Sequence, residues 1–119
     1  MGDNGTVSGS WIWFFRIAAL FNLLIGAGGM LSPEATVDAR IVGLLVLCFG
    51  IVYYFVSRDP LRYASMLWAG VIGKVGVVAL LAPEAFGAGG QPLIAGILIG
   101  DMLFALGFLA FLFGKSSTD

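Results

Sequence analysis

Residues 93–113 read LIAGILIGDMLFALGFLAFLF, an apolar run interrupted by one acidic residue, Asp101. A run of this length can cross the hydrocarbon core of a bilayer, which needs about 20 residues at a rise of about 1.5 Å each. Three further apolar runs precede it, at residues 11–31, 41–56 and 63–81. The sequence therefore predicts an all-α integral membrane protein, a four-helix bundle with its spans at these four ranges.

The composition agrees with a membrane location. Hydrophobic residues make up 60% of the 119-residue chain and charged residues only 11%, too few to give a water-soluble fold of this size a polar surface. We expect the four-helix domain to fill residues 11–113, with short polar tails at 1–10 and 114–119. The net charge of −1 comes without a basic cluster, so nucleic acid is not an expected partner.

The inventory of reactive side chains is small. The chain has no histidine and a single cysteine, Cys48, which excludes an internal disulfide and leaves no His/Cys cluster for zinc or an iron–sulfur centre. No Ser-His-Asp or Cys-His set can be assembled either. We therefore expect no metal and no cofactor, and the inventory leans against an enzyme without deciding the question. An enzyme acting on a lipid, with Asp101 as acid or base, ranks below the other functions considered.

One short motif occurs twice. The pentapeptide LSPEA at residues 31–35 returns as LAPEA at 81–85, 50 residues later. The repeated motif fits two helical hairpins related as a parallel repeat, or two copies of the same interfacial turn. It also argues against the interpretation of the segment after Arg16 as a cleavable signal peptide. Serine, proline and glutamate in this order are typical of a helix start, so short interfacial helices are expected over residues 32–39 and 83–86.

The connections differ in charge. The connection at 57–62 carries two arginines, whereas the other connections carry Glu34, Asp38 and Glu84. Since cytoplasmic loops are enriched in basic residues, this pattern predicts that the middle connection and both termini are cytoplasmic. Arg40 counts against this orientation.

Lys74 and Asp101 are the ionisable residues deepest in the apolar runs. Lys74 lies 9 residues before Pro83 and Asp101 lies 9 residues after Pro92, so both sit about 13 Å of helix from the same face. A lone charge at this depth costs about 3 kcal/mol or more, and contact between the two would relieve that cost. The sequence predicts this contact, and leaves open whether the pair joins two helices or forms a protonatable or ligand-binding site.

Two further polar residues are candidates for the same site. Asn22, eleven residues before Pro33, could reach the layer of the pair or could make a hydrogen bond that only packs two helices. Arg16, about five residues inside the first span, could line a site or could anchor the span by reaching to the interface.

Small and aromatic residues suggest how the third and fourth spans pack. Glycines there predict close helix contact, and the phenylalanines of the fourth span are expected to face lipid. The residues concerned are Gly73, Gly76, Gly96 and Gly100, and Phe104, Phe108, Phe111 and Phe113.

Several short stretches carry a family resemblance: NLL at 22–24, LSPE at 31–34, SRDP at 57–60, GK at 73–74 and GDMLF at 100–104. Together they resemble the small four-helix bacterial membrane proteins loosely grouped with DoxX-like families. The resemblance implies a four-helix bundle in the bacterial inner membrane. Some DoxX-type proteins serve as subunits of quinone-linked oxidoreductases, but no catalytic residue carries over to these positions.

Two functions follow from these observations. The first is a non-catalytic accessory or hydrophobic-ligand-binding subunit, with the bilayer and a second copy or a larger membrane complex as partners. The alternative is a small dimeric transporter or proton-coupled carrier that uses Asp101 and Lys74. A carrier needs a polar cavity open to one side, whereas an accessory bundle should keep the pair closed.

Overall fold

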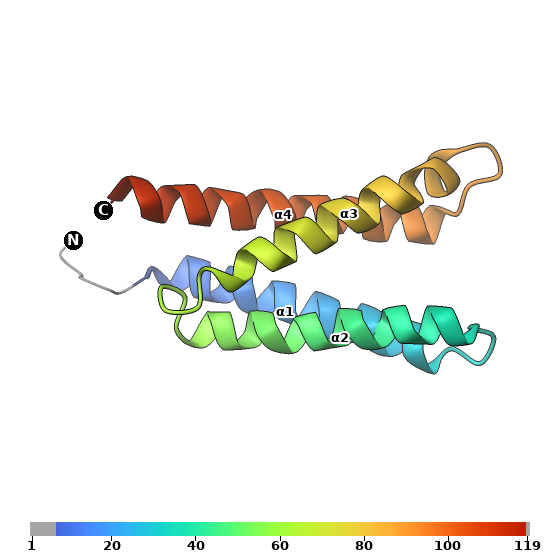
Figure 1. Ribbon diagram of the computed structural model, residues 1–119, viewed down its shortest axis with the longest axis horizontal. Helices are drawn as coiled ribbons and strands as arrows, with labels where there is room; N and C mark the ends of the chain where they lie inside the picture. Colours follow the sequence, from blue (N-terminus) through green and yellow to red (C-terminus); the bar gives the residue numbers. More distant parts are fainter. Residues whose placement is uncertain (1–6, 119) are drawn as a thin grey trace. The chain divides into compact units, whose positions relative to one another are not determined.

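The structure, a computed structural model, describes residues 7–118, with side chains described as far as Gly114. It contains four α-helices: α1 (Gly9–Leu31), α2 (Val37–Arg58), α3 (Met66–Phe86) and α4 (Pro92–Thr118) (Figure 1). The prediction of an all-helical chain with four long apolar helices is confirmed. Each helix is long and apolar enough to cross a membrane.

The chain divides into two compact units at the boundary between Ala64 and Ser65. In the first hairpin, α1 packs against α2, and in the second hairpin, α3 packs against α4. Figure 1 shows α1 and α2 running alongside each other, whereas α3 crosses α4 at a visible angle.

Glycines bring the backbones of α1 and α2 into direct contact. A Cβ atom at Gly26 would lie 2.5 Å from the backbone nitrogen of Leu47 and 2.6 Å from the backbone oxygen of Gly43. A Cβ atom at Gly43 would lie 2.6 Å from the backbone nitrogen of Met30. Any larger residue at either glycine would push the two helices apart, as expected where small residues let membrane helices approach closely.

Gly73, Gly76 and Gly96 of the second hairpin make no such contacts, which corrects the sequence-based expectation for these three residues. A Cβ atom added at Gly73, Gly76 or Gly96 would meet nothing within 4 Å. Two phenylalanines expected to face lipid, Phe108 and Phe111, are instead buried. The reason is that a count of small or aromatic residues does not say which face of a helix they occupy.

The turn between α1 and α2 does not contain the short helix expected over residues 32–39. Pro33 and Glu34 form a turn, and α2 begins at Val37. The residue that caps α2 is Thr36, whose Oγ1 accepts a hydrogen bond from the backbone N–H of Ala39 at 3.1 Å. This hydroxyl satisfies one of the N–H groups left free at a helix start, and so favours a start at Val37, four residues after Pro33.

Arg40 closes the same turn. Its guanidinium donates hydrogen bonds to the backbone oxygens of Met30 at 3.0 Å, Ala35 at 3.3 Å and Pro33 at 3.4 Å. Met30 lies in the last turn of α1, where carbonyl groups lack helical partners and carry partial negative charge. The positive charge of Arg40 is therefore held against carbonyls at the end of α1.

The second copy of the pentapeptide behaves differently. Residues 83–86 are the last turn of α3, with Pro83 inside the helix, and not a separate short helix. Ala82 stands where the first copy has Ser32, and alanine favours helix while the serine hydroxyl competes for backbone groups. The helix ends at Phe86, before a turn in which Gly89 has a φ of 74°.

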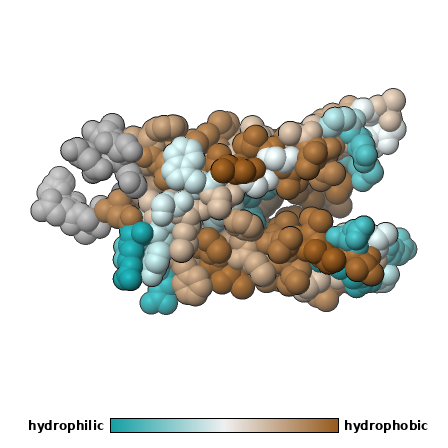
Figure 2. Space-filling view, viewed as in Figure 1, coloured by the Kyte–Doolittle hydropathy of each residue, from teal (hydrophilic) through white to brown (hydrophobic). Residues whose placement is uncertain are grey.

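Large apolar side chains are exposed on every helix, for example Leu24, Leu45, Ile72 and Leu103. Figure 2 shows hydrophobic residues along the helices of each hairpin and hydrophilic residues at its turn. A water-soluble protein rarely exposes apolar surface on this scale, so the surface fits a lipid environment.

Candidate functional site

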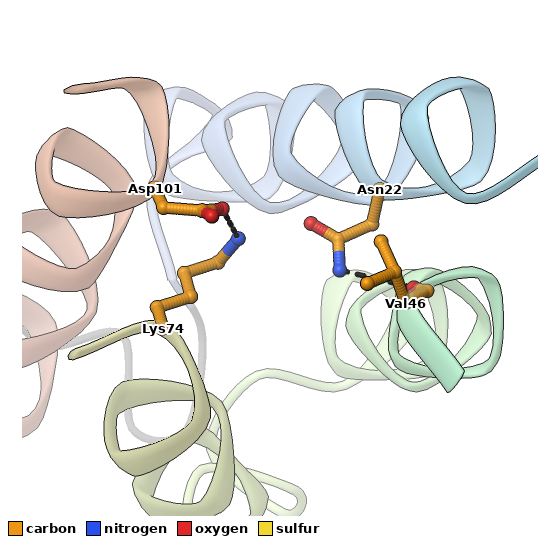
Figure 3. Close-up of polar contacts among 4 residues, drawn as sticks. All are labelled: Asn22, Val46, Lys74 and Asp101. Carbon is orange, nitrogen blue, oxygen red and sulfur yellow. Dashed lines mark hydrogen bonds and ion pairs between the residues drawn. The ribbon is translucent and has the colours of Figure 1, made fainter. Parts of the chain in front are cut away.

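A lysine and an aspartate meet between the two helices of the second hairpin. Nζ of Lys74, on α3, lies 2.7 Å from Oδ1 of Asp101, on α4 (Figure 3). The side chain of Lys74 is 5% exposed and that of Asp101 is 14% exposed. The contact predicted from the matched depth of the two residues is confirmed.

The aromatic ring of Phe104 also lies close to the lysine. Nζ of Lys74 lies 5.6 Å from the centroid of this ring, within the range of a cation–π interaction. Phe104 follows Asp101 by three residues, so both lie on one face of α4. The ammonium group is thus held by a carboxylate and a ring from neighbouring turns of the same helix.

Apolar residues flank the pair along both helices. Four such residues, one or two helical turns from Lys74 or Asp101, are buried, so the pair lies on an apolar face of each helix. They are Leu67 and Val71 on α3, and Leu98 and Ala105 on α4.

The chemistry open to this arrangement is limited. The lysine can donate to the carboxylate and the pair can join α3 to α4, and a proton can in principle move between the two groups. Among the described residues, no group of three or more His, Cys, Asp or Glu side chains lies close enough to hold a metal ion. Every buried side-chain nitrogen or oxygen in that part of the chain has a hydrogen-bond partner.

Asn22 lies in the first hairpin, where it is 5% exposed. Its Nδ2 donates a hydrogen bond to the backbone oxygen of Val46 on α2 at 3.1 Å (Figure 3). This bond joins α1 to α2, which is the packing role considered from the sequence. That Asn22 also reaches the layer of Lys74 and Asp101 stays a prediction.

Arg16 is exposed on α1, seven residues after the helix begins at Gly9. Its Cζ lies 5.5 Å from the centroid of the Trp13 ring, and this ring is the group it contacts among the described residues. The position fits an arginine that reaches toward a membrane interface.

Sequence reasoning missed the structural role of Arg40. It was counted only as a charge on the acidic side of the membrane, whereas its guanidinium holds the turn between α1 and α2. The sequence feature that could have indicated this role is the position of Arg40. It lies four residues after Thr36, in the first turn of the helix that follows the turn at Ser32 and Pro33.

Comparison of the chain with protein-family models, with curated proteins and with solved structures finds no match. The resemblance to DoxX-like families therefore stays a prediction, and the function has to be argued from the residues themselves.

Proposed function

We propose that this chain is a small multi-pass protein of the bacterial inner membrane, whose two hairpins pack as a four-helix bundle. Its role is that of a non-catalytic accessory or hydrophobic-ligand-binding subunit. The observation that carries the proposal is the closed pair of Lys74 and Asp101, with 2.7 Å between the charged atoms and little exposure of either side chain.

The closed pair favours this role over a proton-coupled carrier. A carrier has to expose its ionisable group to a water-filled path at some stage of its cycle. Here each charge is held by the other and flanked by apolar residues, which is the arrangement that makes two charges tolerable in lipid.

The charges at the ends of the first hairpin support cytoplasmic termini. Arg58 and Arg62 are exposed near the end of α2, at the connection expected in the cytoplasm. Arg40, which counted against this orientation, is engaged with three carbonyl oxygens of its turn. The exposed charges left at that turn are Glu34 and Asp38, which agrees with the positive-inside rule.

An accessory role also agrees with the resemblance to DoxX-like proteins, some of which are subunits of larger complexes. The bilayer and a larger membrane complex, or a second copy of the chain, are the partners this role requires. The helices occupy most of the described chain and the turns between them are short, so any partner protein is met mainly within the membrane.

The test compares proton transport and partner binding in one preparation. The full chain is purified in a mild detergent, its bound proteins and small molecules are identified, and the protein is reconstituted into vesicles that enclose a pH-sensitive dye. We expect a co-purifying partner or hydrophobic ligand, and no proton flux above that of protein-free vesicles. Proton flux that Asp101→Asn abolishes and Asp59→Asn, a change in the exposed connection, leaves intact would replace the accessory role with that of a carrier.

A further inference from the structure

We propose that the exposed face of α1 binds one anionic phospholipid, with the phosphate on Arg16 and an acyl chain along the apolar side chains that follow it. The inference rests on the membrane insertion proposed above, but not on the role of the Lys74–Asp101 pair.

Among the described residues, no hydrogen-bond acceptor is seen for the guanidinium of Arg16, which lies at a depth where acceptors are scarce. Arg16 lies about 10 Å along α1 from Gly9, at a rise of about 1.5 Å per residue. It is exposed, and α1 contains no acidic residue that could pair with it. The Trp13 ring attracts the charge but accepts no conventional hydrogen bond. A guanidinium carries five N–H donors, and in a membrane the phosphate of a headgroup is their natural acceptor.

An apolar stripe continues from Trp13 away from the start of the helix. Trp13, Ile17, Leu20 and Leu24 are spaced by four, three and four residues, so they lie on one face of α1, and all are more than half exposed. Trp13 and Leu24 are 11 residues apart, or about 16 Å of helix, close to half of a hydrocarbon core about 30 Å thick. The length of the stripe matches an acyl chain in one leaflet.

The guanidinium of Arg16 itself favours an anionic lipid. Guanidinium groups bind phosphate through two parallel hydrogen bonds, which a lysine cannot reproduce. A zwitterionic lipid brings its own ammonium group, which competes with Arg16 for the phosphate. Phosphatidylglycerol carries no such group.

The test measures binding of phosphatidylglycerol to the detergent-purified full chain by native mass spectrometry, with phosphatidylcholine of the same acyl chains as the neutral control. The variants are Arg16→Gln, Arg16→Lys and Arg62→Gln. Arg62→Gln is a matched control, because Arg62 is also exposed and also lies over an aromatic ring, 5.4 Å from the centroid of Tyr63.

We expect one tightly held phosphatidylglycerol per chain, and at least about tenfold weaker binding after Arg16→Gln, since hydrogen bonds to charged groups are among the stronger ones. Arg16→Lys should give intermediate binding, and Arg62→Gln should leave binding within about twofold of wild type.

Equal binding of the two lipids, or equal weakening by Arg16→Gln and Arg62→Gln, would overturn the proposal in favour of diffuse surface attraction. Unchanged binding in Arg16→Gln would overturn it as well. Failure of membrane insertion is a separate result, because it appears as loss of the wild-type chain from alkali-washed membranes before any lipid is added.

Discussion

Replacing both members of the ion pair, Lys74→Leu together with Asp101→Leu, should give a protein close to wild type in stability, whereas each single replacement should destabilise it. Both side chains are largely buried, and the two charged atoms are 2.7 Å apart. Removing one partner leaves the other charge buried without its counter-ion. Removing both charges removes the cost of burying a charge together with the attraction between the two.

The magnitudes follow from the burial of the pair. Each single replacement should cost about 3 kcal/mol, the range found for breaking a buried ion pair and for one charge at the centre of a membrane helix. The double replacement should cost about 1 kcal/mol or less, since apolar side chains often replace a buried ion pair at little cost. Lys74→Leu also loses the contact with Phe104, so its loss of stability measures the ion pair less directly than that of Asp101→Leu.

The assay is unfolding of wild type, both single variants and the double variant in one detergent, analysed as a double-mutant cycle. A double variant clearly less stable than both single variants would refute the pairing argument and leave Lys74 and Asp101 as independent sites. If a function of the protein is known by then, a double variant that is folded but inactive would assign that function to the pair.

Three further predictions concern packing, the first turn and topology. Gly43→Ala should destabilise the protein by about 1–3 kcal/mol, because the added Cβ would lie 2.6 Å from a backbone nitrogen. Gly73→Ala should be neutral or stabilising, because there is open space around Gly73. Thermal unfolding in detergent compares the two variants. Arg40→Gln should cost about 1–2 kcal/mol by releasing the turn carbonyls, and Arg62→Gln should cost less than about 0.5 kcal/mol; equal effects would contradict the role of Arg40. Alkaline phosphatase fused after Asp119 should be inactive, since both termini are expected in the cytoplasm, and periplasmic activity would reverse the topology.

The ion pair could be predicted from the sequence because its physics is local and strict. Two opposite charges lie in separate apolar runs, each 9 residues from a proline near the same hairpin turn. Contact between them is the arrangement in which burying both charges costs least free energy, and the structure shows this contact. The four helices were predictable for a similar reason, since long apolar runs in lipid have to satisfy their backbone groups internally.

The details that depend on helix rotation could not be predicted in this way. Glycine is frequent in both hairpins, yet Gly26 and Gly43 form a close contact and Gly73 and Gly96 have open space beside them. Which face a glycine occupies depends on packing, and the sequence gives no separate signal for it. The turns could not be predicted for another reason. The two copies of the motif differ by one residue within the pentapeptide, Ser32 against Ala82, yet the helix stops before the proline in the first copy and continues through it in the second.

The separation of Lys74 and Asp101 along the chain, 27 residues, has a consequence for biosynthesis. At about 5–20 residues per second, the ribosome makes Asp101 roughly 1–5 s after Lys74. During that interval α3 carries an uncompensated charge, which opposes its release into lipid as a single helix. In α1 the one charged residue, Arg16, lies near the helix start and none follows it as far as Leu31, and in α2 none lies between Ile41 and Ser57. We therefore expect the translocon to release α1 and α2 one at a time, and to retain α3 until α4 arrives.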